Sequence, residues 1–204
     1  MGTDGLTAER PASSRQAYVT LATNDDYAIA AAALVRSLEL SGTGADIVVL
    51  HTGGVGPEGL ALLRASTARL VLTELLPTSD GFNATHSRKS IHEKAPFTKG
   101  EKPSFHTPLD NFAKLRLWQL TDYEAVVFID ADAVVLKNCD KLFGYPEFCA
   151  APNVYESLSD FHRLNSGVFT ARPSEATFDA MLAALDQPGA YWRRTDQTLS
   201  LIHI

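Results

Sequence analysis

The amino-terminal part of the chain alternates between short apolar runs and longer stretches in which apolar residues recur at helical spacing. Apolar runs with β-branched residues predict strands at residues 17–23, 46–51 and 69–76. Helices are predicted between them, at residues 24–40 and 57–66. Asn24 or Asp25 can cap the first helix, Ser41-Gly42 can end it, and Pro57 suits the first turn of the second.

The alternation resumes after residue 109. A helix is predicted at residues 110–120, with Asp110 as its cap, and a fully apolar strand follows at residues 124–130. The remaining predicted elements are strands at residues 148–153 and 166–172 and a capped helix at residues 174–185. Strands that alternate with helices predict an α/β fold, with a Rossmann-like, mixed but mainly parallel sheet and right-handed crossovers.

Residues 77–109 interrupt this pattern and show no clean period. A loop of this length inside a compact domain is either functional or disordered. The segment is rich in lysine and histidine, so it is locally basic in a chain whose formal net charge is −6. The sequence leaves its role open, because a solvated charged loop has the same composition as one that contacts a ligand.

Composition narrows the class of protein. A net charge of −6 over 204 residues argues against nucleic-acid or anionic-membrane binding, since both need a basic field. No apolar run approaches the ~20 residues of a membrane span, and the polar start of the chain has no apolar signal segment. The two cysteines, Cys139 and Cys149, form no disulfide framework. We therefore expect reduced thiols and a cytoplasmic protein.

The most informative stretch is VVFIDADAVVL at residues 126–136, where two aspartates interrupt an apolar run. At the carboxyl end of a strand, Asp130 and Asp132 would face one spot in the crevice where open α/β sheets bind ligands. Two buried anions a few ångströms apart repel by about 4 kcal/mol at an effective dielectric near 20. A shared proton, a basic partner or a hard divalent cation would neutralise them.

Two other interpretations of this pair stay open on the residues alone. In one, one aspartate caps the next turn and the other faces water. In the other, the stretch is the first motif of a haloacid-dehalogenase-type phosphatase, with Asp130 as nucleophile and Asp132 as acid/base. That class needs further motifs downstream, including an acidic pair, and the chain shows no acidic pair of the right kind after Asp132.

A second motif has the form G-x-G-x-x-G, at Gly54, Gly56 and Gly59, with Glu74 at about the distance that a dinucleotide fingerprint requires. The fingerprint belongs after the first strand of such a fold, whereas this stretch follows the second. We interpret it as a turn that leads into a helix begun by Pro57.

Four ordered blocks carry a resemblance to a known family: AYVTLATNDDYAIAAAALVRSL, NFAKLRLWQLTDYEAVVFIDADAVVLKNCDKLF, NSGVFTARPS and TDQ. Together they resemble the glycogenin-like family of retaining glycosyltransferases over about residues 17–198. The resemblance implies a GT-A fold, a UDP-sugar donor, Mn²⁺ (or Mg²⁺) as cofactor, and retention at the anomeric carbon. It also sets the expected domain at residues 17–198, after a disordered polar tail at residues 1–16.

The resemblance also implies roles for single residues. The uridine pocket would be lined by Leu21, Thr23, Asn24 and Tyr27. Asp130 and Asp132, with Ala131 between them, would hold the metal that bridges the diphosphate. Lys114 would place an ammonium near phosphate or sugar oxygens, although by itself it reads as a solvated helix lysine.

Further donor contacts are expected from Asn165, Ser166, Gly167 and Gln197, and Asp196 would face the anomeric carbon. The sequence N-S-G at residues 165–167 is also compatible with a plain turn before a strand. In this resemblance, the basic segment at residues 77–109 could close over the diphosphate or contact the acceptor.

The last six residues, LSLIHI, equal the translation of a transposon-end adapter used in sequencing libraries. We therefore expect residues 199–204 to be an artefact and the chain to be a fragment that lacks the family's later metal-ligating histidine. His203 is accordingly a poor candidate for that ligand.

The sequence thus predicts a Mn²⁺-dependent hexosyltransferase that uses a nucleotide sugar, with retention of configuration. The alternatives are a phosphatase or a non-catalytic nucleotide-sugar-binding protein. The sugar, the acceptor (a glycan, a protein or a lipid) and a homodimer are left open.

Overall fold

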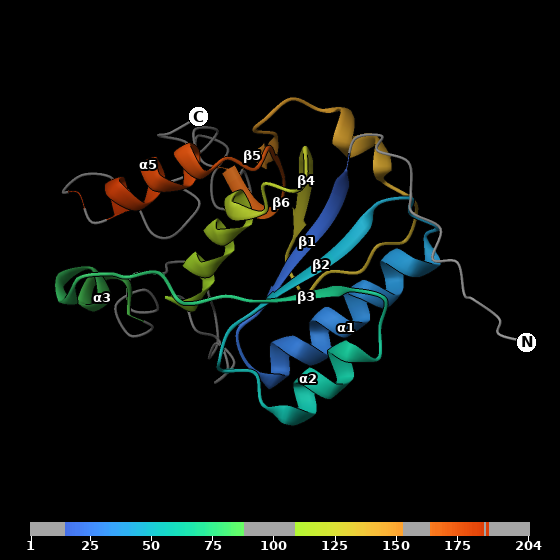
Figure 1. Ribbon diagram of the computed structural model, residues 1–204, viewed down its shortest axis with the longest axis horizontal. Coiled ribbons are helices and arrows are strands. Elements are labelled where there is room, and N and C mark those ends of the chain that lie inside the picture. The colour runs from blue at the N-terminus through green and yellow to red at the C-terminus, as the bar shows by residue number, and fades with distance from the viewer. Residues whose placement is uncertain (1–14, 88–108, 153–163, 186, 188–204) are drawn as a thin grey trace, which may run out of the picture.

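Six strands form one sheet in the part of the chain that the computed structural model describes, which is residues 15–87, 109–152, 164–185 and 187 (Figure 1). The strands are β1 (Gln16–Ala22), β2 (Asp46–His51), β3 (Arg69–Leu72), β4 (Ala125–Ile129), β5 (Ala150–Pro152) and β6 (Leu164–Ala171). Their order is β3-β2-β1-β4-β6-β5. The first four are parallel, while β6 is antiparallel to both β4 and β5. The predicted mixed, mainly parallel α/β sheet is confirmed.

The sheet reverses its direction of growth at β1. The chain moves outward from β1 through β2 to β3 and then returns to the other side of β1 as β4. Val19 of β1 pairs with Val48 of β2 on one side and with Phe128 of β4 on the other. Ligands of open α/β sheets bind at such a switch point, outside the carboxyl ends of the strands. The residues that follow β1 and β4 therefore flank the same crevice.

Helices cover both faces of the sheet (Figure 1). α1 (Asp25–Leu40) and α2 (Pro57–Arg64) pack on one face, where Leu34 and Leu38 join a buried core with residues of β1, β2 and β4. The other face carries the 3₁₀-helix η1 (Asp110–Gln119) and the α-helices α3 (Asp80–His86) and α5 (Glu175–Leu185). There, the Trp118 ring stacks on Phe169 with centroids 5.8 Å apart.

The predicted start and end of α1 and the predicted start of α2 are confirmed. Asn24 is the amino-terminal cap of α1, and its Oδ1 accepts a hydrogen bond from the Tyr27 amide at 3.0 Å. Gly42 follows the cap residue Ser41 with a φ of +71°, a left-handed conformation that glycine adopts without steric cost. α2 begins at Pro57, as its fixed φ favours.

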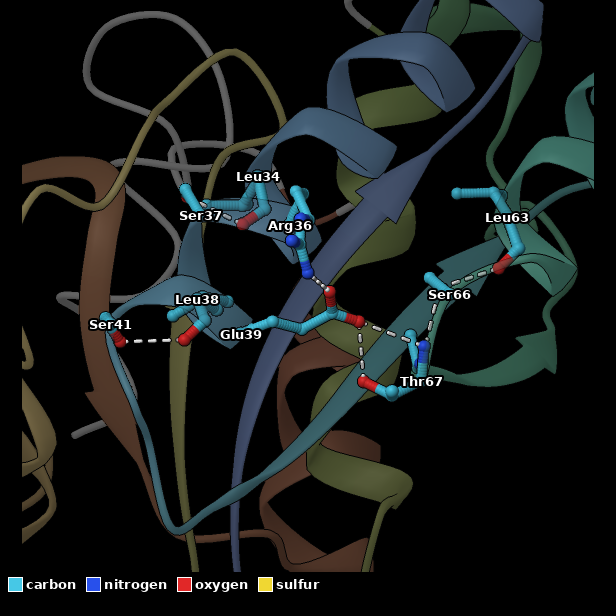
Figure 2. A network of polar contacts seen from close by, with 10 residues as sticks. Leu34, Arg36, Ser37, Leu38, Glu39, Ser41, Leu63, Ser66 and Thr67 are labelled. Atoms are coloured by element: carbon cyan, nitrogen blue, oxygen red, sulfur yellow. Dashed lines mark hydrogen bonds and ion pairs between the residues drawn. The ribbon is translucent and has the colours of Figure 1, made fainter.

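Hydrogen bonds tie the carboxyl end of α1 to the loop before β3 (Figure 2). The Glu39 carboxylate accepts from the Thr67 amide at 3.1 Å and from its hydroxyl at 2.8 Å, and it pairs with Arg36 at 3.0 Å. The hydrogen bonds from Arg36 and Thr67 lower the pKa of Glu39. This contact joins two successive crossovers, β1–α1–β2 and β2–α2–β3, whose helices lie on the same face of the sheet, and it lies at the edge of the sheet away from the switch point.

Three predictions about elements were wrong in detail. Residues 110–119 form a 3₁₀-helix and not an α-helix. Leu109 occupies the N-cap position without a side-chain hydrogen bond, so Asp110 is the first residue of the helix and not its cap. The tighter pitch aligns every third residue, which places Phe112, Leu115 and Trp118 together in the core. The third strand ends at Leu72.

The segment at residues 77–109 contains a helix that its lack of period concealed. The Ser79 hydroxyl accepts from the Phe82 amide at 3.1 Å and caps α3. Phe82 and His86, four residues apart, stack at 4.0 Å and are buried. Residues 88–108 of this segment lie outside the described residues.

The chain after β4 is fixed at its far end by Asp140, the first residue of the 3₁₀-helix η2 (Asp140–Gly144). Its Oδ1 accepts from the Tyr18 hydroxyl at 2.9 Å and from the Thr43 hydroxyl at 2.6 Å, and its Oδ2 accepts from the Gly44 amide at 3.0 Å. Burial alone would raise the pKa of the Asp140 carboxyl, but these hydrogen bonds bring it below the ordinary value.

We expect Asp140→Asn to lower the free energy of unfolding by about 1–3 kcal/mol at neutral pH. Both carboxylate oxygens of Asp140 accept hydrogen bonds, and the NH₂ group of asparagine would put a donor in place of one of these acceptors. A depressed pKa in the folded state stabilises the protein above the unfolded value of about 3.9, and this stabilisation is lost as pH falls through the folded value. Urea unfolding of both proteins from about pH 6 to about pH 3 should therefore show the difference shrinking. A difference that stays constant over this range would contradict the expectation.

Candidate functional site

Asp130 and Asp132 lie in a turn just beyond the strand. β4 ends at Ile129, and the Asp130 amide donates to the Gly167 carbonyl at 2.8 Å, next to the last paired residues of β4 and β6. The Ala133 amide donates back to the Asp130 carbonyl at 3.2 Å. The two aspartates therefore lie beyond the strand, and the premise that strand alternation orients them was wrong. Ala131, between them, is buried in the core under α1.

The expected burial of the pair was also wrong. Asp132 is exposed, and the Asp130 side chain is 42% exposed. The apolar run that follows is only partly buried, since Val134 is 62% and Leu136 89% exposed. Repulsion between the two carboxylates is consequently weaker than it would be in a core, and their proximity does not by itself require a cation.

A basic partner is present for one of the two. The Lys114 side chain, 5% exposed, reaches Asp130 Oδ1 with its Nζ at 3.2 Å. The same Nζ lies 3.4 Å from the Ser166 Oγ and 4.9 Å from the centroid of the Phe128 ring. Lysine is almost never this buried unless it is paired. The interpretation of Lys114 as a solvated helix lysine is therefore wrong, and η1 delivers its ammonium to the end of β4.

Tyr27, in the first turn of α1, packs against the core cluster that contains Ile129 and Ala131. Burial raises the pKa of its phenol, the negative charges of Asp132 and Asp130 raise it further, and Lys114 opposes them. The phenol therefore lies within electrostatic range of all three residues. The start of α1 and the turn after β4 form one site.

The start of β6 closes this site. Asn165 Oδ1 accepts from the Gly167 amide at 2.7 Å. A Cβ at residue 167 would lie 2.8 Å from that oxygen and 3.2 Å from Asp130 Oδ2, so Gly167 permits the close approach of β6 to Asp130. Asn165 and Ser166 belong to β6 and not to a plain turn before it.

The predicted residues at the end of β1 have structural roles of their own. Leu21 is buried in the core on the η1 face. The Thr23 carbonyl accepts from the Thr52 hydroxyl at 3.0 Å, and Asn24 caps α1. Sequence reasoning did not predict Thr52, although a threonine directly after a strand and before two glycines was visible.

Several predicted residues lie outside the described part of the chain: Asp196, Gln197, His203 and the six terminal residues 199–204. Within the described residues, no group of three or more His, Cys, Asp or Glu side chains is placed to hold a metal ion. Asp130 and Asp132 offer two carboxylates, the oxygen ligands that hard divalent cations prefer. They fit part of a metal site, which nucleotide phosphates and water could complete.

A pocket of about 500 Å³ opens at the opposite, amino-terminal edge of the sheet and contains none of the predicted site residues. Its polar lining is bonded internally: Arg69 pairs with Asp122, and the Tyr123 hydroxyl donates to Asp46 at 3.3 Å. Of the helices in the described ranges, none combines the length and apolarity needed to cross a membrane.

We expect Asp130→Asn to lower the free energy of unfolding by about 1–3 kcal/mol, because it leaves the buried Lys114 ammonium without its counter-charge. Asp132→Asn is the matched control and should change stability by less than about 0.5 kcal/mol, since Asp132 is exposed. Urea unfolding measures both. Equal effects of the two substitutions would contradict a structural role for the Lys114–Asp130 pair.

Comparison with known proteins agrees with this geometry. Solved structures with the same fold include the galactosyltransferase LgtC in complex with donor and acceptor sugar analogues (TM-score 0.55, 15% identity, 91% of this chain and 69% of LgtC). Another is the glycosyltransferase GlyE of Streptococcus pneumoniae TIGR4 (TM-score 0.59, 15% identity, 92% of this chain and 42% of GlyE). At this identity the likeness shows the fold alone, which is the predicted GT-A fold.

Sequence relatives are closer. UDP-glucuronate:xylan alpha-glucuronosyltransferase 2 of Arabidopsis thaliana is 33% identical over 187 residues, which are 91% of this chain and 27% of that protein. Human glycogenin-1 is 34% identical over 176 residues, 86% of this chain and 45% of glycogenin-1. The chain thus spans less than half of either relative. The sequence model of Glycosyl transferase family 8 matches residues 18–167, which is most of the chain, and the chain belongs to this family.

Proposed function

We propose that this domain binds a UDP-hexose at the carboxyl ends of β1 and β4 and transfers the hexose to an acceptor, with Mn²⁺ and with retention of anomeric configuration. One observation supports this most: residues from four different parts of the chain converge at the switch point of the sheet. They are Lys114 on η1, Asp130 after β4, Ser166 and Gly167 on β6, and Tyr27 on α1. Such a concentration of polar groups is what a charged, polyhydroxylated ligand needs.

The nucleoside half of the donor would lie against the β1–α1 loop. Backbone groups of Leu21, Thr23 and Asn24 suit hydrogen bonds with the edge of uracil, and Tyr27 offers an aromatic face beside it. The uridine assignment is supported by relatives whose names specify UDP-glucuronate as donor. The sugar transferred by this protein is not fixed by that likeness.

Asp130 and Asp132 would hold the Mn²⁺ through their carboxylate oxygens. Ala131, between them, anchors the turn because its side chain is buried in the core. When bound, the metal supplies positive charge that stabilises the departing diphosphate. Lys114 adds a fixed ammonium on the same side. Because Asp130 and the Ser166 hydroxyl hold that ammonium in place, little reorganisation is needed when negative charge develops.

The donor sugar would lie over the start of β6, within reach of the side chains of Asn165 and Ser166 and close to the backbone at Gly167. Asp196, with Gln197 beside it, would face the anomeric carbon from the part of the chain beyond the described residues. The family match does not favour the phosphatase interpretation, in which Asp130 would be a nucleophile. The acceptor class stays open between a glycan, a protein and a lipid.

Titration calorimetry of the full-length gene product with Mn²⁺ and UDP tests the metal assignment. Replacing both Asp130 and Asp132 by asparagine should weaken Mn²⁺-dependent UDP binding at least about tenfold. The control is Glu58→Gln, which removes an exposed charge in the first turn of α2. If the double variant takes up manganese as the wild type does, the metal assignment is wrong.

Proton NMR of the products tests the reaction. The full-length gene product with Mn²⁺ and α-linked UDP-hexoses should release or transfer the sugar with the α-configuration formed first. Asp196→Asn should abolish this turnover while leaving UDP affinity within about threefold, because Asp196 is assigned to the anomeric carbon and not to the nucleotide. Formation of the β-anomer first would contradict retention.

A further inference from the structure

We propose that the turn between β2 and α2 positions the β1–α1 loop, so that Thr52 and Gly54 determine nucleobase selectivity as positioning residues. This inference rests on the proposed function, because it takes the loop after β1 as the nucleobase side of the donor site. It also assigns a role to the glycine-rich stretch at residues 53–59, which the sequence alone indicates only as a turn that leads into a helix.

The turn holds the Thr23 peptide group directly. The Thr52 hydroxyl donates to the Thr23 carbonyl at 3.0 Å, and both residues are buried. The Thr52 hydroxyl oxygen in turn accepts from the Gly54 amide at 3.2 Å, and the Thr52 amide donates to the Ala22 carbonyl at 3.1 Å. A chain of hydrogen bonds thus joins the end of β1 to the turn after β2.

Gly54 is required by close backbone contact. A Cβ at this position would lie 2.3 Å from the Thr23 carbonyl oxygen and 3.4 Å from its carbon. Because the obstructing atoms are backbone, no side-chain rotation can relieve the overlap. A Cβ at the neighbouring Gly53 would meet nothing within 4 Å. A methyl group is therefore accommodated at Gly53 but overlaps the backbone of Thr23 at Gly54.

The remaining glycines of the motif fasten the same loop further along. The Gly56 amide donates to Asp25 Oδ1 at 2.8 Å. A Cβ at Gly59 would lie 2.4 Å from that oxygen and 3.0 Å from the Ala28 Cβ. The start of α2 is thereby packed against the first turn of α1, which also carries Tyr27.

The consequence for a ligand follows from peptide geometry. In a planar trans peptide, the Thr23 carbonyl and the Asn24 N–H point in opposite directions. Holding the carbonyl toward Thr52 therefore directs the Asn24 N–H away from the turn. A shift of the Thr23 peptide would move the hydrogen-bonding groups that are proposed to read the base.

The carboxylate half of the site has separate supports. Asp130 is held by the Gly167 carbonyl on β6 and by Lys114 on η1, and neither contact involves residues 52–59. A disturbance of the β2–α2 turn should therefore weaken base recognition and leave metal–diphosphate binding intact. A general loss of stability would weaken both.

The test compares Gly54→Ala with Gly53→Ala in the full-length gene product, by calorimetry with Mn²⁺ and three probes: UDP, ADP and inorganic pyrophosphate. Gly54→Ala should bind UDP at least about tenfold more weakly and show a smaller preference for UDP over ADP. Its pyrophosphate affinity, and all affinities of Gly53→Ala, should stay within about twofold of the wild type.

A second pair of variants covers the case in which Gly54→Ala does not fold. Thr52→Val keeps the shape but removes the hydroxyl, and it should weaken UDP binding about threefold to tenfold. Thr52→Ser keeps the hydroxyl and should restore the affinity to within about twofold.

Three outcomes would overturn the proposal: equal UDP binding by the two alanine variants, parallel loss of UDP and pyrophosphate, or no difference between Thr52→Val and Thr52→Ser. A wild type that binds pyrophosphate but no nucleotide would instead refute the proposed function itself, and the selectivity role with it. The wild-type titration is therefore done first.

Discussion

The ion pair between Lys114 and Asp130 is the interaction on which the arrangement of the site depends. It joins a helix on one face of the sheet to the end of a central strand, and through Ser166 it includes the neighbouring antiparallel strand. Almost all of the lysine side chain is removed from water, whereas its partner is 42% exposed. Removing the counter-charge of a buried ammonium costs more than the pair contributes, so the geometry is strongly enforced.

This asymmetry has chemical meaning. A carboxylate that is paired on one side and open on the other can still offer an oxygen to a ligand in the crevice. Asp132, exposed and without such a partner in the described contacts, is free of the structural constraint that holds its neighbour. Asp130 therefore has an architectural role in addition to its proposed role in binding, whereas Asp132 has the proposed binding role alone.

Much of the fold was predictable because the relevant signals are local. Asn24, Gly42 and Pro57 mark helix ends through their own hydrogen bonds or backbone preferences, and these predictions were confirmed. The 3₁₀ geometry at residues 110–119 was not predictable, because the spacing of core contacts selects it. The burial of Lys114 and the exposure of Asp132 were missed for a related reason. Both depend on which distant segments pack at the site, and no residue type reports that by itself.

The reversed direction of β6 has a consequence for how such a site can be assembled. Because β6 runs against β4, its first residues, and not its last, lie beside Asp130. In a parallel strand of the same length, Asn165–Gly167 would lie four to six residues before the end beside Asp130, roughly 13–20 Å away toward the opposite rim of the sheet. A single inverted strand thus brings the beginning of one segment beside the end of another at the same edge of the sheet, so that the polar groups of both face one crevice.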